Sequence, residues 1–223
     1  NTVYVKKTSG YTTASTITLS TDITDGVPIT WIGYATTRGD NGQATVTSTD
    51  AAATQVIEVT GAGNILRNIT TDGASLSVRG IRLNDYGIVL DGCEGKNCTQ
   101  HGIYVTSSAL KAMVKRCRAV GNGAGGTHSG FACEGEVGTF DRCVSRGNSG
   151  FGFYGVLGTP RWINCIASGN TLDGFYVAGN NDSVEMFYCT SYGNTRDGLR
   201  VESASLIGGT VRNCIFVANS GYG

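Results

Sequence analysis

The sequence predicts an all-β protein built as a solenoid, in which short strands stack in parallel from one coil to the next. Three observations predict it: abundant glycine, a repeat of 22 to 26 residues, and a short strand pattern inside each repeat. The 223 residues include 34 glycines, about twice the average share, and only 2 prolines. Because each glycine inside a helix costs about 1 kcal/mol relative to alanine, this composition disfavours long helices.

Composition and charge exclude several other classes. Hydrophobic residues make up 40% of the chain, which excludes a disordered protein. The 17 basic and 17 acidic residues cancel, so we expect no nucleic-acid partner. No apolar run is long enough for membrane insertion. The chain has no phosphate loop, metal-spaced histidine pair or dinucleotide fingerprint, so we expect neither a metal nor a cofactor.

Cysteines carry the clearest repeat. Six of the eight recur at intervals of 24, 26, 22, 24 and 25 residues: Cys93, Cys117, Cys143, Cys165, Cys189 and Cys214. There is no C-x-x-C pair, so the spacing fits neither a zinc site nor a usual disulfide framework. A period of this length over most of a chain predicts a solenoid. We therefore expect a structural ladder of small, apolar thiols inside the coil.

An asparagine follows each of the last five of these cysteines by five residues: Asn122, Asn148, Asn170, Asn194 and Asn219. Asparagine tolerates left-handed backbone at a turn, and its amide can bond to the amides above and below it. This spacing predicts an internal asparagine ladder. In the same alignment Asn68 takes the cysteine place one coil before Cys93, and the pattern degrades there.

A second block in each repeat begins with glycine and alternates apolar with other residues, as a short strand does. The apolar places are expected to face inward: Ile81, Leu83, Ile103, Val105, Phe131, Cys133, Phe153, Phe175, Val177, Leu199 and Val201. The alternate places are expected to face outward: Arg82, Tyr104, Ala132, Tyr154, Tyr176 and Arg200.

The repeat divides the chain into two parts. Residues 1–52 are expected to form capping strands and a loop, and residues 53–223 the coils of one continuous domain. Within the first part, the Thr/Asp/Gly-rich residues 35–52 predict a protruding loop, and residues 121–129 predict a second loop further on. The sequence stops in the turn before a strand, where a solenoid exposes unpaired edges. We therefore expect a further C-terminal domain or a homo-oligomer, with a trimer as one arrangement.

With these motifs the chain resembles the right-handed parallel β-helix family, which includes pectate lyases, polygalacturonases and phage tailspikes. The resemblance rests on Cys-x-x-x-Gly-Asn followed by Gly-aromatic-x-Val, and it covers residues 56–223. It implies a right-handed, single-stranded parallel β-helix of about eight coils, placed outside the cell or on a virion surface. The motif is specific for the fold and nearly silent on activity.

The outward places provide a candidate carbohydrate-binding stripe: Arg82, Tyr104, Tyr154, Tyr176 and Arg200. Sugar rings pack on exposed aromatic faces, and arginine holds carboxylates or sulfates with two parallel hydrogen bonds. In the alternative interpretation these tyrosines only stack on one another and stabilise the sheet. Ala132 interrupts the stripe, and both interpretations stay open.

A weaker set of candidates is catalytic. Asp173 and Asp197 take the same place in consecutive coils, so their carboxylates could lie roughly 5 Å apart, the separation of a retaining glycosidase. Arg200 and Glu202 lie nearby in the sequence and complete a charged cluster. Aspartate before glycine is also ordinary turn chemistry. The two histidines, His101 and His128, are expected at the surface.

These observations favour a rigid, phage-fibre-like or tailspike-like module that binds polysaccharide or a cell-surface glycan, or displays a recognition surface. One alternative is a polysaccharide lyase or glycoside hydrolase that acts on the outward strand face. A second alternative is a purely structural spacer.

Overall fold

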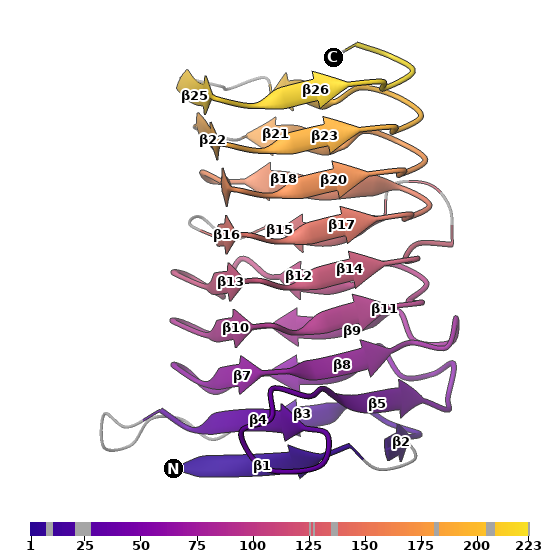
Figure 1. Ribbon diagram of the computed structural model, residues 1–223, viewed down its shortest axis with the longest axis vertical. Coiled ribbons are helices and arrows are strands. Elements are labelled where there is room, and N and C mark those ends of the chain that lie inside the picture. The colour runs from indigo at the N-terminus through magenta and orange to yellow at the C-terminus, as the bar shows by residue number, and fades with distance from the viewer. Residues whose placement is uncertain are drawn as a thin grey trace.

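The computed structural model describes residues 1–7, 11–20, 28–124, 126, 128–134, 138–180, 183–203 and 208–222. These residues form strands and turns and, within those ranges, no helix. Accordingly, none of the described residues belongs to a helix long and apolar enough to cross a membrane. Three successive strands make one coil, and each strand pairs in parallel with the strand three places further along the chain (Figure 1).

The strands lie in three parallel sheets. The first sheet contains β1 (Thr2–Lys6), β4 (Thr30–Tyr34), β7 (Ile65–Arg67), β10 (Val89–Asp91), β13 (Met113–Lys115), β16 (Thr139–Asp141), β19 (Arg161–Ile163), β22 (Ser183–Phe187) and β25 (Gly208–Arg212). The second sheet contains β2 (Tyr11–Thr13), β5 (Ala44–Ser48), β8 (Ile69–Asp72), β11 (Glu94–Lys96), β14 (Arg118–Val120), β17 (Val144–Arg146), β20 (Ile166–Ser168), β23 (Thr190–Tyr192) and β26 (Ile215–Val217). The third sheet contains β3 (Ile17–Leu19), β6 (Gln55–Val59), β9 (Arg79–Leu83), β12 (Ile103–Val105), β15 (Ser129–Cys133), β18 (Phe151–Leu157), β21 (Phe175–Asn180) and β24 (Leu199–Ser203).

This architecture is a right-handed parallel β-helix, as the repeat predicts, with the two chain ends at opposite ends of the column (Figure 1). The segment expected to cap the coil contributes β1 to β5 to the same three sheets. The predicted protruding loop is wrong in part, because Ala44–Ser48 form β5 and pair with β8. The threonine-rich composition of β5 resembles a loop, yet β-branched threonine suits a pleated strand.

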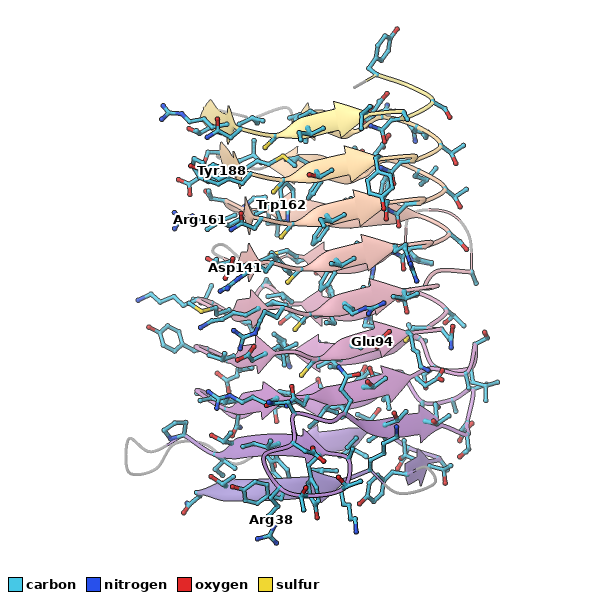
Figure 2. The ribbon with its side chains drawn as sticks, in the orientation of Figure 1. Arg38, Glu94, Asp141, Arg161, Trp162 and Tyr188 are labelled. Carbon is cyan, nitrogen blue, oxygen red and sulfur yellow. The ribbon has the colours of Figure 1, made fainter. Side chains whose placement is uncertain are left out.

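The interior is made of columns of like residues, one from each coil. Phe131, Phe153 and Phe175 stack with ring centroids 4.8 Å apart and nearly parallel planes. Trp162 packs beside them, 1% exposed, while its chain neighbour Arg161 points away from the core (Figure 2). The offset stacking of so many rings adds to the burial of apolar area.

The six cysteines of the ladder lie along the interior as free thiols, all buried except the half-buried Cys214. Burial raises the pKa of the Cys93 and Cys117 thiols well above the ordinary value. A protonated thiol is a small hydrophobe rather than a nucleophile, so these cysteines fill the core.

The asparagines form one buried, hydrogen-bonded column. Each side-chain Nδ2 donates to the Oδ1 of the asparagine in the next coil, at 3.1 Å from Asn122 to Asn148, 2.8 Å to Asn170, 2.9 Å to Asn194 and 2.8 Å to Asn219. Each backbone N–H of the column donates to the same oxygen, at 3.0 to 3.1 Å. Cys98 takes the asparagine place one coil earlier and donates its N–H to Asn122 at 3.1 Å.

One expectation about the register is wrong. Asn68 does not take the cysteine place: Glu94 pairs with Thr70, so Cys93 lies opposite Ile69, and Asn68 is the preceding turn residue with φ of 54°. The same turn place is left-handed in every later coil, at Gly92, Arg116, Arg142, Asn164, Tyr188 and Asn213. Val201 keeps its register opposite Val177 but is 38% exposed, because β24 is the last strand of its sheet.

Candidate functional site

The candidate site is the outer face of the third sheet, defined by one column of outward residues. The strand register places one of them in each coil: Glu58, Arg82, Tyr104, Ala132, Tyr154, Tyr176 and Arg200. All five residues of the predicted stripe therefore share one column, and Ala132 interrupts it as expected. Repetition at one residue per coil spaces these groups by about 4.8 Å along the helix axis.

Three aromatic rings pack together on this face: the partly exposed Tyr154 and Tyr176 and the buried Phe151. Tyr154 and Tyr176 are stacked with centroids 5.6 Å apart and planes 7° apart. Phe151 packs on them from the neighbouring column, 4.3 Å from Tyr176 and 5.4 Å from Tyr154. The faces of the two tyrosines thus cover one another, and this part of the face presents ring edges and hydroxyl groups.

Glu202 links the tyrosines to the arginine at the end of the column. Its carboxylate accepts a hydrogen bond from the Tyr176 hydroxyl at 2.7 Å and from Arg200 Nε at 2.8 Å. These two donors lower the pKa of Glu202. Burial, together with the bond to Glu202, raises the pKa of Tyr176 to about 12. Glu202 is therefore a fixed anion, 46% exposed, beside a neutral tyrosine and a cation.

The middle of the face is covered rather than open. Tyr104 is only 8% exposed, because Arg79 lies over its ring at 4.7 Å and His101 stacks on it at 5.4 Å. Its hydroxyl donates to Glu134, and burial followed by this bond raises the pKa of Tyr104 to about 12. Tyr104 therefore faces outward, but other side chains shield it from solvent.

His101 belongs to this covered cluster, so the prediction of a surface histidine is wrong for it. Its ring is 9% exposed, and its Nδ1 lies 2.9 Å from the hydroxyl and 3.2 Å from the backbone nitrogen of Ser129. Burial, then the neighbouring His128 and Arg79, lower the pKa of His101 to about 3. Because Ser129 is fully buried, this pair holds the turn together and offers no nucleophile to a substrate.

At the other end of the column, Arg82 is paired with Glu58 of the preceding coil. Gln55 donates from Nε2 to the second oxygen of that carboxylate at 2.9 Å. The Arg82 side chain is 30% exposed. This end of the face thus presents one oriented guanidinium that already has a partner.

Asp173 and Asp197 form a turn ladder. Asp173 Oδ1 accepts the Asp197 backbone N–H at 2.8 Å, and Asp197 Oδ1 accepts the N–H of Tyr222 at 2.7 Å. The Asp173 side chain is fully buried, its Oδ2 has no partner, and burial raises its pKa. Arg196 Nε lies 3.7 Å from Oδ1. A carboxyl group without exposed surface cannot reach a substrate, so of the four catalytic candidates only Asp197, Arg200 and Glu202 remain within reach of one.

Sequence reasoning missed the column that flanks the tyrosines, which holds Arg79, His101 and Phe151. These residues take the place just before the strand glycine, the place of Asp173 and Asp197, as the bonds of Gly80 to His101 and of Gly152 to Asp173 show. Comparing residue types at that place along the repeat could have found them. Among the described residues, no group of three or more histidine, cysteine or acidic side chains could hold a metal ion.

Comparison with known proteins agrees with this fold. A family described as "Right handed beta helix region" matches residues 127–223. The structure is similar to the crystal structure of pectate lyase Pel9A, with a TM-score of 0.70 and 16% identity over 99% of this chain and 70% of that chain. It is also similar to ORF18 of Geobacillus virus E2, with a TM-score of 0.61 and 16% identity over 89% of this chain and 46% of that chain. No curated protein matches the sequence.

Proposed function

We propose that this right-handed parallel β-helix is an extracellular or virion-associated module that binds polysaccharide along the outer face of the third sheet. The observation that carries the proposal is the outward column itself, in which successive coils present tyrosine hydroxyls, carboxylates and guanidinium groups at a regular spacing. An extended polysaccharide also repeats its hydroxyl groups regularly, so several sugar units can bond to one such column.

Binding on this face would rest on hydrogen bonds more than on sugar-to-ring stacking. The stacked pair Tyr154 and Tyr176 exposes edges and hydroxyls, and Arg200 with Glu202 supplies a cation and an anion in fixed positions. Preorganised groups of this kind lose little side-chain entropy on binding. The similarity to a pectate lyase supports a polysaccharide ligand, and the similarity to a virus protein supports a place on a virion.

A panel of neutral and uronate-containing oligosaccharides tests the proposal by isothermal titration calorimetry. The double variant Tyr154→Ala/Tyr176→Ala should weaken binding to this face at least about tenfold, a loss of about 1.4 kcal/mol. The matched control is Tyr188→Ala/Tyr192→Ala, because both tyrosines are exposed, at 59% and 46%, and lie away from the third sheet. Equal affinities for the two double variants would refute binding on this face.

A second candidate function is catalysis on the same face, as a polysaccharide lyase or glycoside hydrolase. The observation that favours it is the bonded pair of Arg200 and Glu202 beside Tyr176, with Asp197 in the turn that precedes the same strand. Turnover of the same panel, measured as release of reducing ends, tests it. Product release by the wild type that disappears in Glu202→Gln or Asp197→Asn would establish an enzyme, whereas binding without product release supports a binding module.

A further inference from the structure

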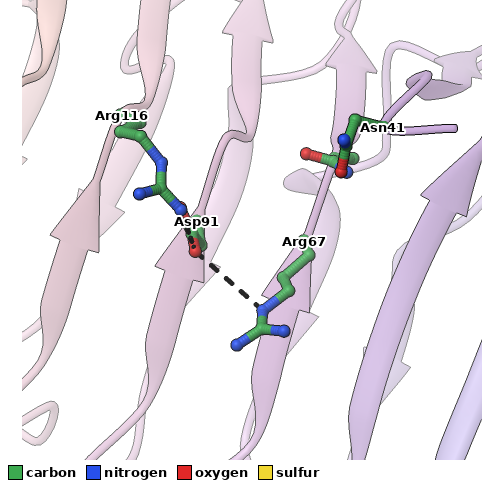
Figure 3. A pocket seen from close by; sticks show the side chains of 5 residues that line it. Asn41, Arg67, Asp91 and Arg116 are labelled. Atoms are coloured by element: carbon green, nitrogen blue, oxygen red, sulfur yellow. Dashed lines mark hydrogen bonds and ion pairs between the residues drawn. The ribbon is translucent and has the colours of Figure 1, made fainter. Parts of the chain in front are cut away.

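A polar cavity lies away from the third sheet, at the turn from the first sheet to the second. Its volume is about 500 Å³, and it is lined by Asn41, Arg67, Asn68, Asp91 and Arg116 (Figure 3). Arg67 and Asp91 end the neighbouring strands β7 and β10 and lie opposite one another in the register. Asn68 and Arg116 are left-handed turn residues, with φ of 54° and 51°. We call this cavity the arginine pocket.

One wall of the arginine pocket is a short, well-bonded loop that contains Asn41. The Asp40 carboxylate accepts the backbone N–H groups of Ala35, Thr36, Thr37 and Gly42 at 2.6 to 3.0 Å. These bonds hold the pKa of Asp40 well below its usual range, so the loop stays bonded at all ordinary pH values. Gln43, two residues after Asn41, donates from Nε2 to the Gly92 carbonyl at 2.9 Å and accepts from the Thr70 hydroxyl at 2.8 Å. This wall of the pocket is thus hydrogen-bonded to the two coils that follow it in the chain. The pocket is therefore formed before any ligand binds.

Positive charge exceeds negative charge inside this pocket. Arg116 Nη2 lies 2.6 Å and Arg67 Nε lies 3.9 Å from the same oxygen, Oδ2 of Asp91 (Figure 3). One carboxylate therefore serves two guanidinium groups, which leaves a net charge of about +1. The side chains of Arg67 and Arg116 are 49% and 55% exposed. Each guanidinium carries five N–H donors in a planar fork.

We propose that the arginine pocket binds the carboxylate of an acidic sugar residue, a uronate. A carboxylate matches the planar fork of arginine with two parallel hydrogen bonds, and a single negative charge balances the excess of one positive charge. The amides of Asn41 and Asn68 both donate and accept, which is what the ring hydroxyls of a sugar require. This inference stands on the pocket alone and is independent of binding on the third sheet.

Calorimetric titration of the full chain with a trigalacturonate probe tests the assignment. Arg116→Gln and Arg67→Gln should each weaken the affinity about tenfold or more, because each removes one charged fork. Arg116→Lys should also weaken it, because an ammonium group keeps the charge but loses the fork. The matched control is Arg161→Gln: Arg161 lies on the same sheet, is 47% exposed and pairs with Glu185 at 3.0 Å, but lines no part of the pocket. It should change the affinity less than twofold.

Two further arms identify the ligand and the place. In the double variant Tyr154→Ala/Tyr176→Ala, which should keep the arginine-dependent component of binding, a neutral galactose trimer and inorganic sulfate should each bind at least tenfold more weakly than trigalacturonate. Neutral trimer or sulfate that binds this variant as tightly as the uronate, and loses affinity in Arg67→Gln or Arg116→Gln, would overturn the sugar class. Affinity that is unchanged in both Arg67→Gln and Arg116→Gln would overturn the site. Since both arginine side chains are about half exposed, we expect these variants to fold, and circular dichroism checks that they do.

Discussion

The interior columns and the outer face of the third sheet use the same coil geometry in opposite ways. Inside, each column keeps one kind of chemistry, with runs of identical residues: cysteine on cysteine, asparagine on asparagine, phenylalanine on phenylalanine. Outside, the column changes from arginine to tyrosine to alanine and back, and its members bond to charged neighbours. In the interior, each coil therefore makes the same side-chain contacts with the next coil. On the outer face, each coil presents a different side chain to solvent.

This difference separates what stabilises the molecule from what can recognise a ligand. A buried ladder makes the same hydrogen bonds or ring contacts at each step. Removing one of its side chains therefore lowers the free energy of unfolding. An exposed, varied column contributes little to stability, because surface ion pairs are worth about 0 to 1 kcal/mol. Substitutions inside should therefore lower the free energy of unfolding, and substitutions outside should change binding.

The largest effect is expected from the phenylalanine stack. Phe153→Ala removes a fully buried ring that lies 4.8 Å from its partner on either side, and it should lower the free energy of unfolding by about 3–5 kcal/mol. Urea denaturation measures the loss. Tyr188→Ala, at a 59% exposed position, serves as the control and should cost less than about 0.5 kcal/mol. Similar losses of unfolding free energy in the two variants would contradict the claim that interior columns stabilise the protein more than exposed residues do.

The asparagine ladder should show the next largest effect. Asn170→Ala removes the buried oxygen that accepts both the backbone N–H and the side-chain amide of Asn148, and one of the two hydrogen bonds to Asn194 Oδ1, at a cost of about 3 kcal/mol. Asn219→Ala, at the half-buried end of the same ladder, should cost about 1 kcal/mol because water can replace its bonds. Urea denaturation of both variants measures this difference in the free energy of unfolding. Equal losses would show that the stabilisation by the ladder does not depend on burial.

The covered cluster on the outer face predicts a pH dependence. His101 has a pKa of about 3 in the folded protein against 6.5 ordinarily, so the unfolded chain binds a proton that the folded chain does not. The free energy of unfolding should therefore fall as the pH falls, by about 2 kcal/mol between pH 6.5 and pH 5 from this group. His128, whose pKa burial also lowers, adds to the same slope.

Denaturation at both pH values in His101→Gln checks this prediction. The variant should lose most of the slope, while His128→Gln should lose a smaller part, because His128 is the more exposed of the two rings. A slope that persists unchanged in His101→Gln would mean that other groups set the acid response.

The smallest effect on stability is expected from Tyr176→Phe. The change keeps the stack on Tyr154 but removes the hydroxyl that donates to Glu202, so stability should change by less than about 1 kcal/mol. The pKa of Glu202 should rise toward its ordinary value, because one of its two donors is lost. A carboxyl NMR titration measures the shift, with Tyr192→Phe as the control. An unchanged Glu202 pKa would contradict the bonded pair.

Much of the scaffold could be predicted from the sequence because a solenoid repeats its residues. The similar spacing of Cys117, Cys143 and Cys165 is enough to predict a column, and period-2 alternation is enough to assign Phe153 and Tyr154 to opposite sides. The one-residue error at Asn68 arose where the pattern has no cysteine. The turn before the cysteine place is occupied by asparagine, glycine and arginine in different coils. The type of residue therefore does not show which position of the repeat it occupies.

The details of the site could not be predicted in the same way. Tyr104 is buried by Arg79 of the preceding coil, His101 of its own coil and Glu134 of the following coil, none of which belongs to the column of Tyr104. No periodicity in the sequence indicates which unlike residues will meet. The arginine pocket could not be predicted for the same reason. Asn41, which lies outside the repeat, lines it together with Arg67 and Arg116.

A crystal structure of the chain with an oligosaccharide that it binds is the most direct test of the proposed working face. The account predicts sugar units along the outer face of the third sheet, with hydrogen bonds to the Tyr176 hydroxyl, Glu202 and Arg200. A saccharide bound solely against the first or second sheet, with these three side chains left in their present contacts, would contradict it.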